Sequence, residues 1–262
     1  MRRSALILAA LCAMVASLSS TAQTPGLVSL VDESLNYDVY YKWGFINKLA
    51  GHATMSLVND GDLYMATVTA RNAEWANSIF LVRDTLYSTM NRNNLSPVLY
   101  TFLSHENKRY KKDVVKFSQV GDTFYGECFR ESRKKPGQPL QTSTMQLEAE
   151  GPTVDMLSSF YYIRSIDFGS MNPGQEVVLN IFSATKKERL TITYLGTGSV
   201  NANGSDQNTY NISFTFTRNG VESSSPIYAW LSLDDRRIPL KIEGSLPVGK
   251  VRAFFTGENA TW

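Results

Sequence analysis

The strongest constraint on the fold is a repeated alternation of apolar and polar residues over short runs. The cleanest run is 210–217, where apolar side chains occupy every second position and Asn, Ser or Thr fills the positions between them. Alternating side chains lie on opposite faces of an extended strand, so one face can be buried while the other is solvated. A chain built from such runs is predicted to form antiparallel β structure.

About fourteen runs of this kind follow one another. Turn sequences such as Gly121-Asp122 and Asn219-Gly220 separate several of them, as β-hairpins require. This number of strands exceeds what a flat open sheet usually tolerates. We therefore expect an all-β, mainly antiparallel fold, with a large, strongly curved sheet that forms a barrel or half-barrel. The expected strands are 35–42, 51–58, 63–71, 84–90, 98–104, 113–118, 123–130, 142–148, 176–183, 189–195, 210–217, 227–233, 238–244 and 251–255.

Two segments depart from the alternation. Segment 153–166 has helical spacing, and Thr153 or Asp155 can cap its first amides. We expect one short helix there, and one or two helical turns at 74–81. The residues that share the predicted helix face at i, i+3, i+4 and i+7 are Leu157, Phe160, Tyr161 and Arg164.

The beginning of the chain has the order of a secretory signal peptide. Arg2 and Arg3 precede an apolar run at 5–16, and small residues follow as far as Ala22. We expect cleavage after Ala22 and export to the periplasm, with the mature protein soluble there, associated with the outer membrane or released from the cell. After the signal no apolar stretch approaches the roughly 20 residues of a transmembrane helix.

The remaining chain, 23–262, has no linker that convincingly divides it. We expect a single β-barrel-like domain. The alternative is two β halves, 35–148 and 176–255, joined by the helical segment 153–166.

Charge excludes some classes of partner and points to one region. The chain has 26 Lys+Arg against 24 Asp+Glu, and both surplus cations lie in the leader. Without a net cationic excess, general nucleic-acid or anionic-membrane binding is disfavoured. Residues 104–139 nevertheless hold nine basic and five acidic side chains. This hairpin is either simply solvated or docks an anionic head group or a partner. The predicted contact residues are Lys111, Lys112, Arg133 and Lys134.

No motif for catalysis, a metal or a cofactor stands out. His52 and His105 are the only histidines and neither has the spacing of a zinc site. Cys128 is the one cysteine outside the leader, so no internal disulfide is expected, and its place on a strand favours burial over reactivity. The run 234–237, Asp-Asp-Arg-Arg, could bind calcium or transfer protons but is better explained as a charged turn that neutralises itself. A Ser–His–Asp triad with members far apart remains open.

Aromatic residues are the other conspicuous class. Most of them are explained by core packing, but a barrel of this many strands is too wide for side chains to fill completely. Its interior could therefore hold an apolar or amphipathic ligand such as a lipid. The predicted ligand-binding residues are Tyr41, Trp43, Phe160, Tyr161 and Trp230.

Four segments together resemble one protein family. Segment 37–53 reads Tyr-Asp-Val-Tyr-Tyr-Lys-Trp-Gly-Phe-Ile-Asn-Lys-Leu-Ala-Gly-His-Ala, which is similar to the opening of the family called domain of unknown function 3108. Segment 155–164 resembles its central helix, and 230–240 and 246–253 resemble its ending. Members are mostly exported bacterial proteins, so the resemblance implies export. Because no activity is established for the family, it implies no catalytic residue.

Three hypotheses of function follow. The leading one is an exported barrel that binds an apolar or amphipathic molecule in the cell envelope. The alternative is an envelope assembly or scaffold protein that recognises a protein or glycan through the hairpin 104–139. An enzyme is the least favoured, and it requires His52 or His105 to lie in a cleft within hydrogen-bond reach of a carboxylate or hydroxyl.

Overall fold

A computed structural model describes residues 30–78, 81–222 and 224–259 of the chain. The expected signal peptide, residues 1–22, lies outside the described residues. Within them, sixteen strands join into one sheet that is mostly antiparallel and nearly closed into a barrel, as the alternation predicts. All fourteen expected strands are present, and the two further strands have only three and two residues, too few to show a period.

The elements have the following bounds. The strands of the first part are β1 (Glu33–Trp43), β2 (Ile46–Asp60), β3 (Leu63–Asn72), β4 (Val82–Asn91), β5 (Pro97–Glu106), β6 (Arg109–Val120), β7 (Thr123–Arg133) and β8 (Gln141–Glu150). Those of the second part are β9 (Thr153–Asp155), β10 (Glu176–Ser183), β11 (Lys186–Ala202), β12 (Ser205–Arg218), β13 (Val221–Glu222), β14 (Ile227–Ser232), β15 (Pro239–Ser245) and β16 (Lys250–Glu258). The helices are η1 (Glu74–Ser78), α1 (Ser158–Ser165) and η2 (Phe168–Ser170).

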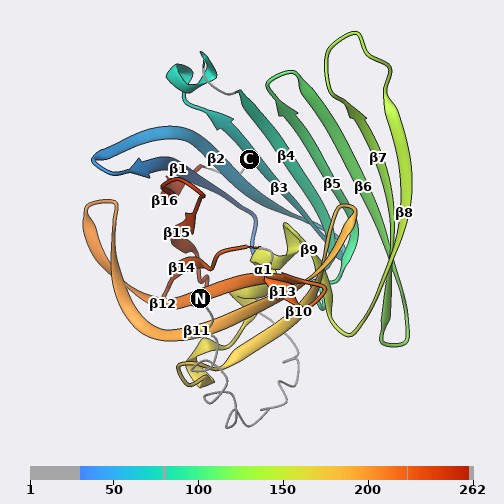
Figure 1. Cartoon of the computed structure of the whole chain (residues 1–262). Coiled ribbons are helices and arrows are strands. Elements are labelled where there is room, and N and C mark those ends of the chain that lie inside the picture. The colour runs from blue at the N-terminus through green and yellow to red at the C-terminus, as the bar shows by residue number, and fades with distance from the viewer. Residues whose placement is uncertain (1–29, 79–80, 223, 260–262) are drawn as a thin grey trace, which may run out of the picture.

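Strands β1 to β8 form an antiparallel meander in which each strand pairs with the next. On the other side of β1 the sheet continues through β16, β15, β14, β12, β11 and β10 to β9, and β13 pairs with β12 alone. The pairing of β1 with β16 therefore joins the first and the last strands of the chain. Figure 1 shows β1–β8 as one curved wall, β10–β12 sweeping opposite it, and α1 between the two.

The edge strand β8 approaches β10 and β11 without a backbone ladder. The Nδ2 group of Asn180 on β10 donates to the carbonyl of Glu150 on β8 at 2.7 Å, and Nζ of Lys187 on β11 donates to the carbonyl of Glu148 at 2.8 Å. On the same seam, the fully buried ring of Phe182 stacks on the ring of Phe117, with centroids 5.7 Å apart. Side-chain contacts therefore close this seam, whereas backbone hydrogen bonds join the other neighbouring strands of the sheet.

Helix α1 lies inside the sheet and is buried on nearly all sides. Leu157, just before it, and Tyr161 are fully buried in the cluster formed with β1–β7. Tyr162 and Ile163 pack into a second cluster, formed with β10–β14. The residues of the expected helical stripe are therefore buried or partly buried, and the helix lies between two core clusters.

The helix is shorter than its predicted range 153–166. Residues Thr153–Asp155 form β9, which pairs in parallel with β10. The carboxylate of Asp155 then accepts hydrogen bonds from the amides of Leu157 and Ser158, each at 2.7 Å. Of the two predicted capping residues, Asp155 is the one that caps the helix, and the backbone before it is held extended by the ladder to β10.

A buried ion-pair network fixes α1 to the barrel. Arg164 and Glu33 of β1 are both almost inaccessible, and Nη2 of Arg164 donates to Oε2 of Glu33 at 3.0 Å. Arg236 reaches the same carboxylate at 3.0 Å and also binds Glu258 of β16. A charge in this position is stable only because it is paired and hydrogen-bonded.

The charged turn at 234–237 does not neutralise itself as predicted. Oδ1 of Asp234 accepts the backbone amides of Arg236 and Arg237, both at 3.0 Å, which shapes the turn. The guanidiniums point elsewhere: Arg236 binds Glu33 and Glu258, and Arg237 donates to the carbonyl of Arg164 at 3.1 Å. Carboxylates remote in sequence meet here because β1 and β16 are neighbours.

Candidate functional site

A pocket of about 520 Å³, open to solvent on one side, lies between the wall formed by β4–β7 and the strands β10–β12 opposite. We call it the interior cavity. Pockets for small molecules usually measure about 300–1,000 Å³, so this volume suits a ligand. The lining residues are Leu86, Tyr100, Phe102, Lys111, Arg130, Met156, Ser183, Ala184, Thr185, Lys186, Glu188, Phe216 and Ser224.

One side of this cavity is apolar. Leu86 and Phe102 stand opposite each other on β4 and β5, on the face that points toward α1. Met156 from the segment before α1 and Phe216 of β12 complete the surface. All four are partly buried hydrophobic residues at the margin of the two core clusters. Contact with a hydrocarbon chain would remove this apolar surface from water, which lowers the free energy of the complex.

The other side is polar and carries Lys111, Arg130, Lys186 and Glu188. Asp113 on β6 is fully buried, and Arg130 on β7 donates to it from Nε and from Nη2, the latter at 2.9 Å. The hydrogen bond to Asp113 raises the pKa of Arg130 above its ordinary value. Nζ of Lys111 lies 3.8 Å from Asp113, which is too long for a hydrogen bond, and 4.5 Å from the centroid of the Phe102 ring. The ammonium of Lys111 is therefore the less satisfied of the two cations.

Cys128 lies on the inner face, two positions from Arg130. Its side chain is fully buried, and burial raises the pKa of the thiol to about 11. A thiol with this pKa is almost entirely protonated at neutral pH and therefore a weak nucleophile. It is a small packing residue.

The structure does not bring the five predicted ligand-binding residues together. Phe160 and Tyr161 belong to α1, where they pack in the core. Tyr41 donates to the carbonyl of Val248 near the far end of β1, and Trp43 is 55% exposed beside the β1–β2 turn. Trp230 lies under Nζ of Lys241, 3.9 Å from the ring centroid, in a row with Phe254 on the outer face. None of the five lines the cavity.

The four predicted partner-binding residues are also divided. Lys111 points into the cavity, whereas Lys112 is on the opposite face of β6, where it faces Glu131. Arg133 faces Tyr110 on that same outer face, and Lys134 is exposed in the loop after β7. The sequence prediction missed this division because the expected strand began at residue 113, while β6 begins at Arg109. The expected strands did not include residues 105–112, so the faces of Lys111 and Lys112 were not assigned.

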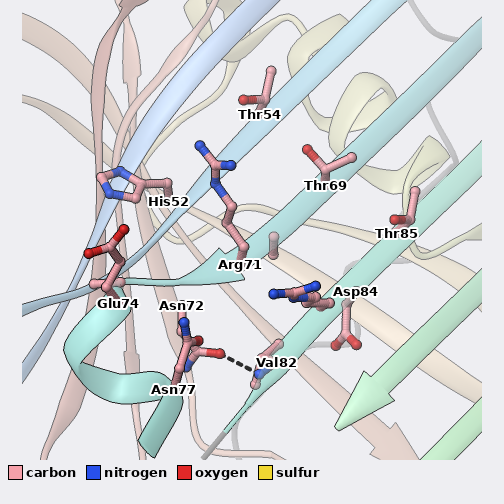
Figure 2. A pocket seen from close by; sticks show the side chains of 13 residues that line it. His52, Thr54, Thr69, Arg71, Asn72, Glu74, Asn77, Val82, Asp84 and Thr85 are labelled. Carbon is pink, nitrogen blue, oxygen red and sulfur yellow. Dashed lines mark hydrogen bonds between the residues drawn. The ribbon is translucent and has the colours of Figure 1, made fainter.

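A second, more polar cleft of about 870 Å³ lies where β2, β3 and β4 end beside η1. Figure 2 shows His52, Arg71 and Glu74 around it, with Thr54 and Thr69 farther along the strands. The β3–β4 ladder ends at Arg71 and Arg83, and one residue farther the amide of Val82 donates to the side-chain Oδ1 of Asn72. The lining residues are His52, Thr54, Thr69, Ala70, Arg71, Asn72, Ala73, Glu74, Asn77, Val82, Arg83, Asp84 and Thr85.

His52 meets the geometric condition set for an enzyme. Its Nδ1 lies 2.8 Å from Oδ1 of Asp38 on β1, so the carboxylate orients the ring within the cleft. His105 instead packs against Tyr110, with centroids 5.2 Å apart. An oriented histidine can act as a base, but among the described lining residues the only hydroxyl groups are those of threonines, and no serine or cysteine is present.

The chain matches the family described as "Protein of unknown function (DUF3108)" over residues 36–256. This protein belongs to the DUF3108 family. The match spans both parts of the sheet and agrees with the resemblance of the four sequence segments. No curated protein matches the sequence significantly. Within the described residues, no helix has the length and apolarity needed to cross a membrane, and no three His, Cys, Asp or Glu side chains are placed to hold a metal ion.

Two solved structures are similar to this DUF3108 protein. One is the β-barrel-like protein of domain of unknown function DUF1849 from Brucella abortus, with a TM-score of 0.60 at 10% identity, covering 88% of this chain and 98% of that one. The other is a Bacteroides fragilis protein with a YmcC-like fold, with a TM-score of 0.36 at 6% identity, covering 88% of this chain and 97% of that one. The first likeness establishes the barrel-like fold.

Proposed function

We propose that this protein binds an amphipathic molecule with an anionic head, such as a fatty acid, in the interior cavity, and that it does so after export to the cell envelope. The observation that carries the proposal is the cavity itself, with an apolar wall on one side and Lys111 on the other. The signal-like leader supports the location.

The two sides of the cavity suit the two ends of such a ligand. The surface of Leu86, Phe102, Met156 and Phe216 would take the hydrocarbon chain, and each buried CH₂ contributes about 0.8 kcal/mol. The head would lie near Lys111, because Arg130 is already committed to Asp113 by two hydrogen bonds. The ammonium of Lys111 would offset part of the free-energy cost of removing that head from water.

The test compares two neighbouring lysines on opposite faces of β6. Dodecanoate and the uncharged detergent dodecyl maltoside are titrated into the mature protein, below their critical micelle concentrations, by isothermal calorimetry. Lys111→Gln should weaken dodecanoate binding about tenfold, as expected for loss of one charge-assisted hydrogen bond. Lys112→Gln, which makes the same charge change outside the cavity, should leave the affinity unchanged.

A second variant tests the apolar wall. Met156→Trp places a larger side chain in the cavity and should weaken both ligands, whereas Lys111→Gln should affect dodecanoate alone. Circular dichroism of each variant checks that the sheet is retained. The proposal fails if wild-type protein shows no saturable dodecanoate binding, or if Lys111→Gln and Lys112→Gln reduce it equally.

A further inference from the structure

A row of charged and hydrogen-bonding side chains crosses seven strands on the outer face of the barrel. Each member lies directly opposite the next in the strand register, so all point to the same side of the sheet. The row consists of Asp38, His52, Arg71, Arg83, His105, Tyr110 and Arg133. His52, Arg71 and Arg83 of this row line the polar cleft, and the row ends on the hairpin 104–139.

Two arginines stand side by side at the centre of the row. Arg71 and Arg83 are directly opposite each other on β3 and β4, and both are exposed. Within the described part of the chain neither guanidinium forms an ion pair or a side-chain hydrogen bond. Like charges directly opposite on adjacent strands repel, so this pair lowers the stability of the sheet unless an anion lies between them. Cross-strand neighbours are about 5 Å apart at Cα, close enough for both side chains to bind one anion.

The surroundings add further groups for a polar ligand. His52 lies directly opposite Arg71, and the cleft also holds the amides of Asn72 and Asn77 and the hydroxyls of threonines. In Figure 2 the guanidinium of Arg71 extends toward Thr54 and Thr69. The volume of about 870 Å³ exceeds the needs of an inorganic ion alone.

The cleft also contains hydrogen-bond acceptors. Glu74 lines it, and Asp38 approaches His52 from β1. Asp84 also borders the cleft, but its side chain points to the face of β4 opposite to that of Arg83. The exposed carboxylate of Glu74 can accept hydrogen bonds from a ligand. The site therefore combines a place for an anion with acceptors for hydroxyl groups.

We propose that the cleft bounded by His52, Arg71 and Arg83 binds a phosphate monoester carried on a hydroxyl-rich body, that is, a phosphorylated sugar. Two guanidiniums supply the paired donors that phosphate oxygens accept, and the carboxylate of Glu74 with the amide of Asn77 suits sugar hydroxyls. The sugar can be free or displayed on a membrane as the head of a glycolipid. This site is separate from the interior cavity, and neither proposal depends on the other.

The experiment uses the mature wild-type protein and the double variant Arg71→Gln/Arg83→Gln. Calorimetric titration with glucose 1-phosphate should show saturable binding that the double variant weakens at least tenfold. Glucose and inorganic phosphate, each of which lacks half of the ligand, should bind more weakly than glucose 1-phosphate. Sedimentation with phosphatidylcholine vesicles, with and without monophosphoryl lipid A, identifies a membrane-displayed sugar.

The matched control is Arg189→Gln/Arg218→Gln, which removes two exposed arginines from β11 and β12 without touching the cleft. It should bind like wild type. Binding of glucose 1-phosphate supports a free ligand, and selective sedimentation with lipid A vesicles that requires Arg71 and Arg83 supports the glycolipid source. The proposal is overturned if wild type binds neither probe, if glucose 1-phosphate binds no better than inorganic phosphate and lipid A recruits nothing, or if both double variants lose binding equally.

Discussion

At the scale of single residues, Asp155 shows how a local capping role and burial conflict. Its carboxylate caps α1 and accepts a hydrogen bond from Ser88 at 2.6 Å, yet it is completely buried. Burial raises its pKa to about 6, although the hydrogen bonds from Ser88 and the helix amides act in the opposite direction. The residue therefore takes up a proton more readily in the folded chain than in the unfolded chain.

This pKa predicts a specific pH dependence of stability. Because the folded pKa exceeds the unfolded one, the folded state binds more protons between about pH 4 and 6, and the contribution of Asp155 falls as the pH rises through this window. Asp155→Asn keeps the capping oxygen but cannot ionise. We expect wild type to lose up to about 3 kcal/mol relative to the variant between pH 4 and pH 7, measured by urea unfolding.

A second variant checks the cause. Ser88→Ala removes a donor that stabilises the charged form, so the window should move to higher pH. Parallel stability curves for wild type and Asp155→Asn would falsify the assignment.

At the scale of elements, α1 depends on its environment more than on its own sequence. Eight residues are too few for a helix that is stable by itself in water. Its capping carboxylate belongs to β9, and its arginine pairs with β1 and meets the turn after β14. We therefore expect the helix to form only when both parts of the sheet are assembled around it.

Removing the side chain of Arg164 should destabilise the packing of α1 against the sheet. Arg164→Met leaves the buried Glu33 with only the half-exposed Arg236, and breaking a buried pair costs about 3–5 kcal/mol. Chemical unfolding at neutral pH measures this loss. Lys250→Met removes an exposed partner of Glu243 and should cost no more than about 1 kcal/mol. The double variant Arg164→Met/Glu33→Gln removes the unpaired carboxylate and should recover part of the lost stability. If it recovers none, the uncompensated charge of Glu33 is not the cause of the loss.

At the scale of the whole molecule, the barrel has one seam that differs from all its other strand contacts. Between β8 and β10 the backbone ladder is replaced by the packing of Phe182 against Phe117, Leu147 and Ala149. Gly126 belongs to this seam, since a Cβ there would lie 2.7 Å from the Phe182 ring. Closure of the barrel is thus a matter of side-chain fit.

Truncation at the seam should loosen one edge of the barrel. Phe182→Ala should cost about 3–5 kcal/mol, the usual range for a buried phenylalanine. The control, Phe168→Ala, removes an equally buried ring from the other core and should cost a similar amount. Hydrogen exchange distinguishes them, because only Phe182→Ala should accelerate exchange in β8 and β10. Equal acceleration in both variants would argue against a distinct seam.

Much of the architecture could be predicted because alternation is a local property. Every run long enough to show a period of two became a strand, and the helical stripe through Leu157 and Tyr161 is buried as expected. The misses were segments where local pattern and pairing diverged. Thr153–Asp155 is extended only because β10 pairs with it, and the basic run near Lys111 is a strand only because β5 and β7 flank it.

The candidate sites were much less predictable. The aromatic residues that the sequence singled out contribute to the core, a hairpin end and the outer face, while the cavity is lined by Leu86, Phe102 and Met156, which nothing in the sequence distinguished. Arg71 and Arg83 are separated by η1 in the chain and meet only through the register of β3 and β4.

By itself the sequence determined the strands, the helix, the expected export and the family resemblance, since each depends on residues close together in the chain. Only the tertiary structure decided which face of each strand lies inside, how the sheet closes, and that Lys111 and Lys112 serve opposite sides of the wall. The physical reason is that strand register and barrel closure couple residues far apart in sequence. An alternating pattern specifies that two faces exist, whereas contacts across the whole sheet determine what each face meets.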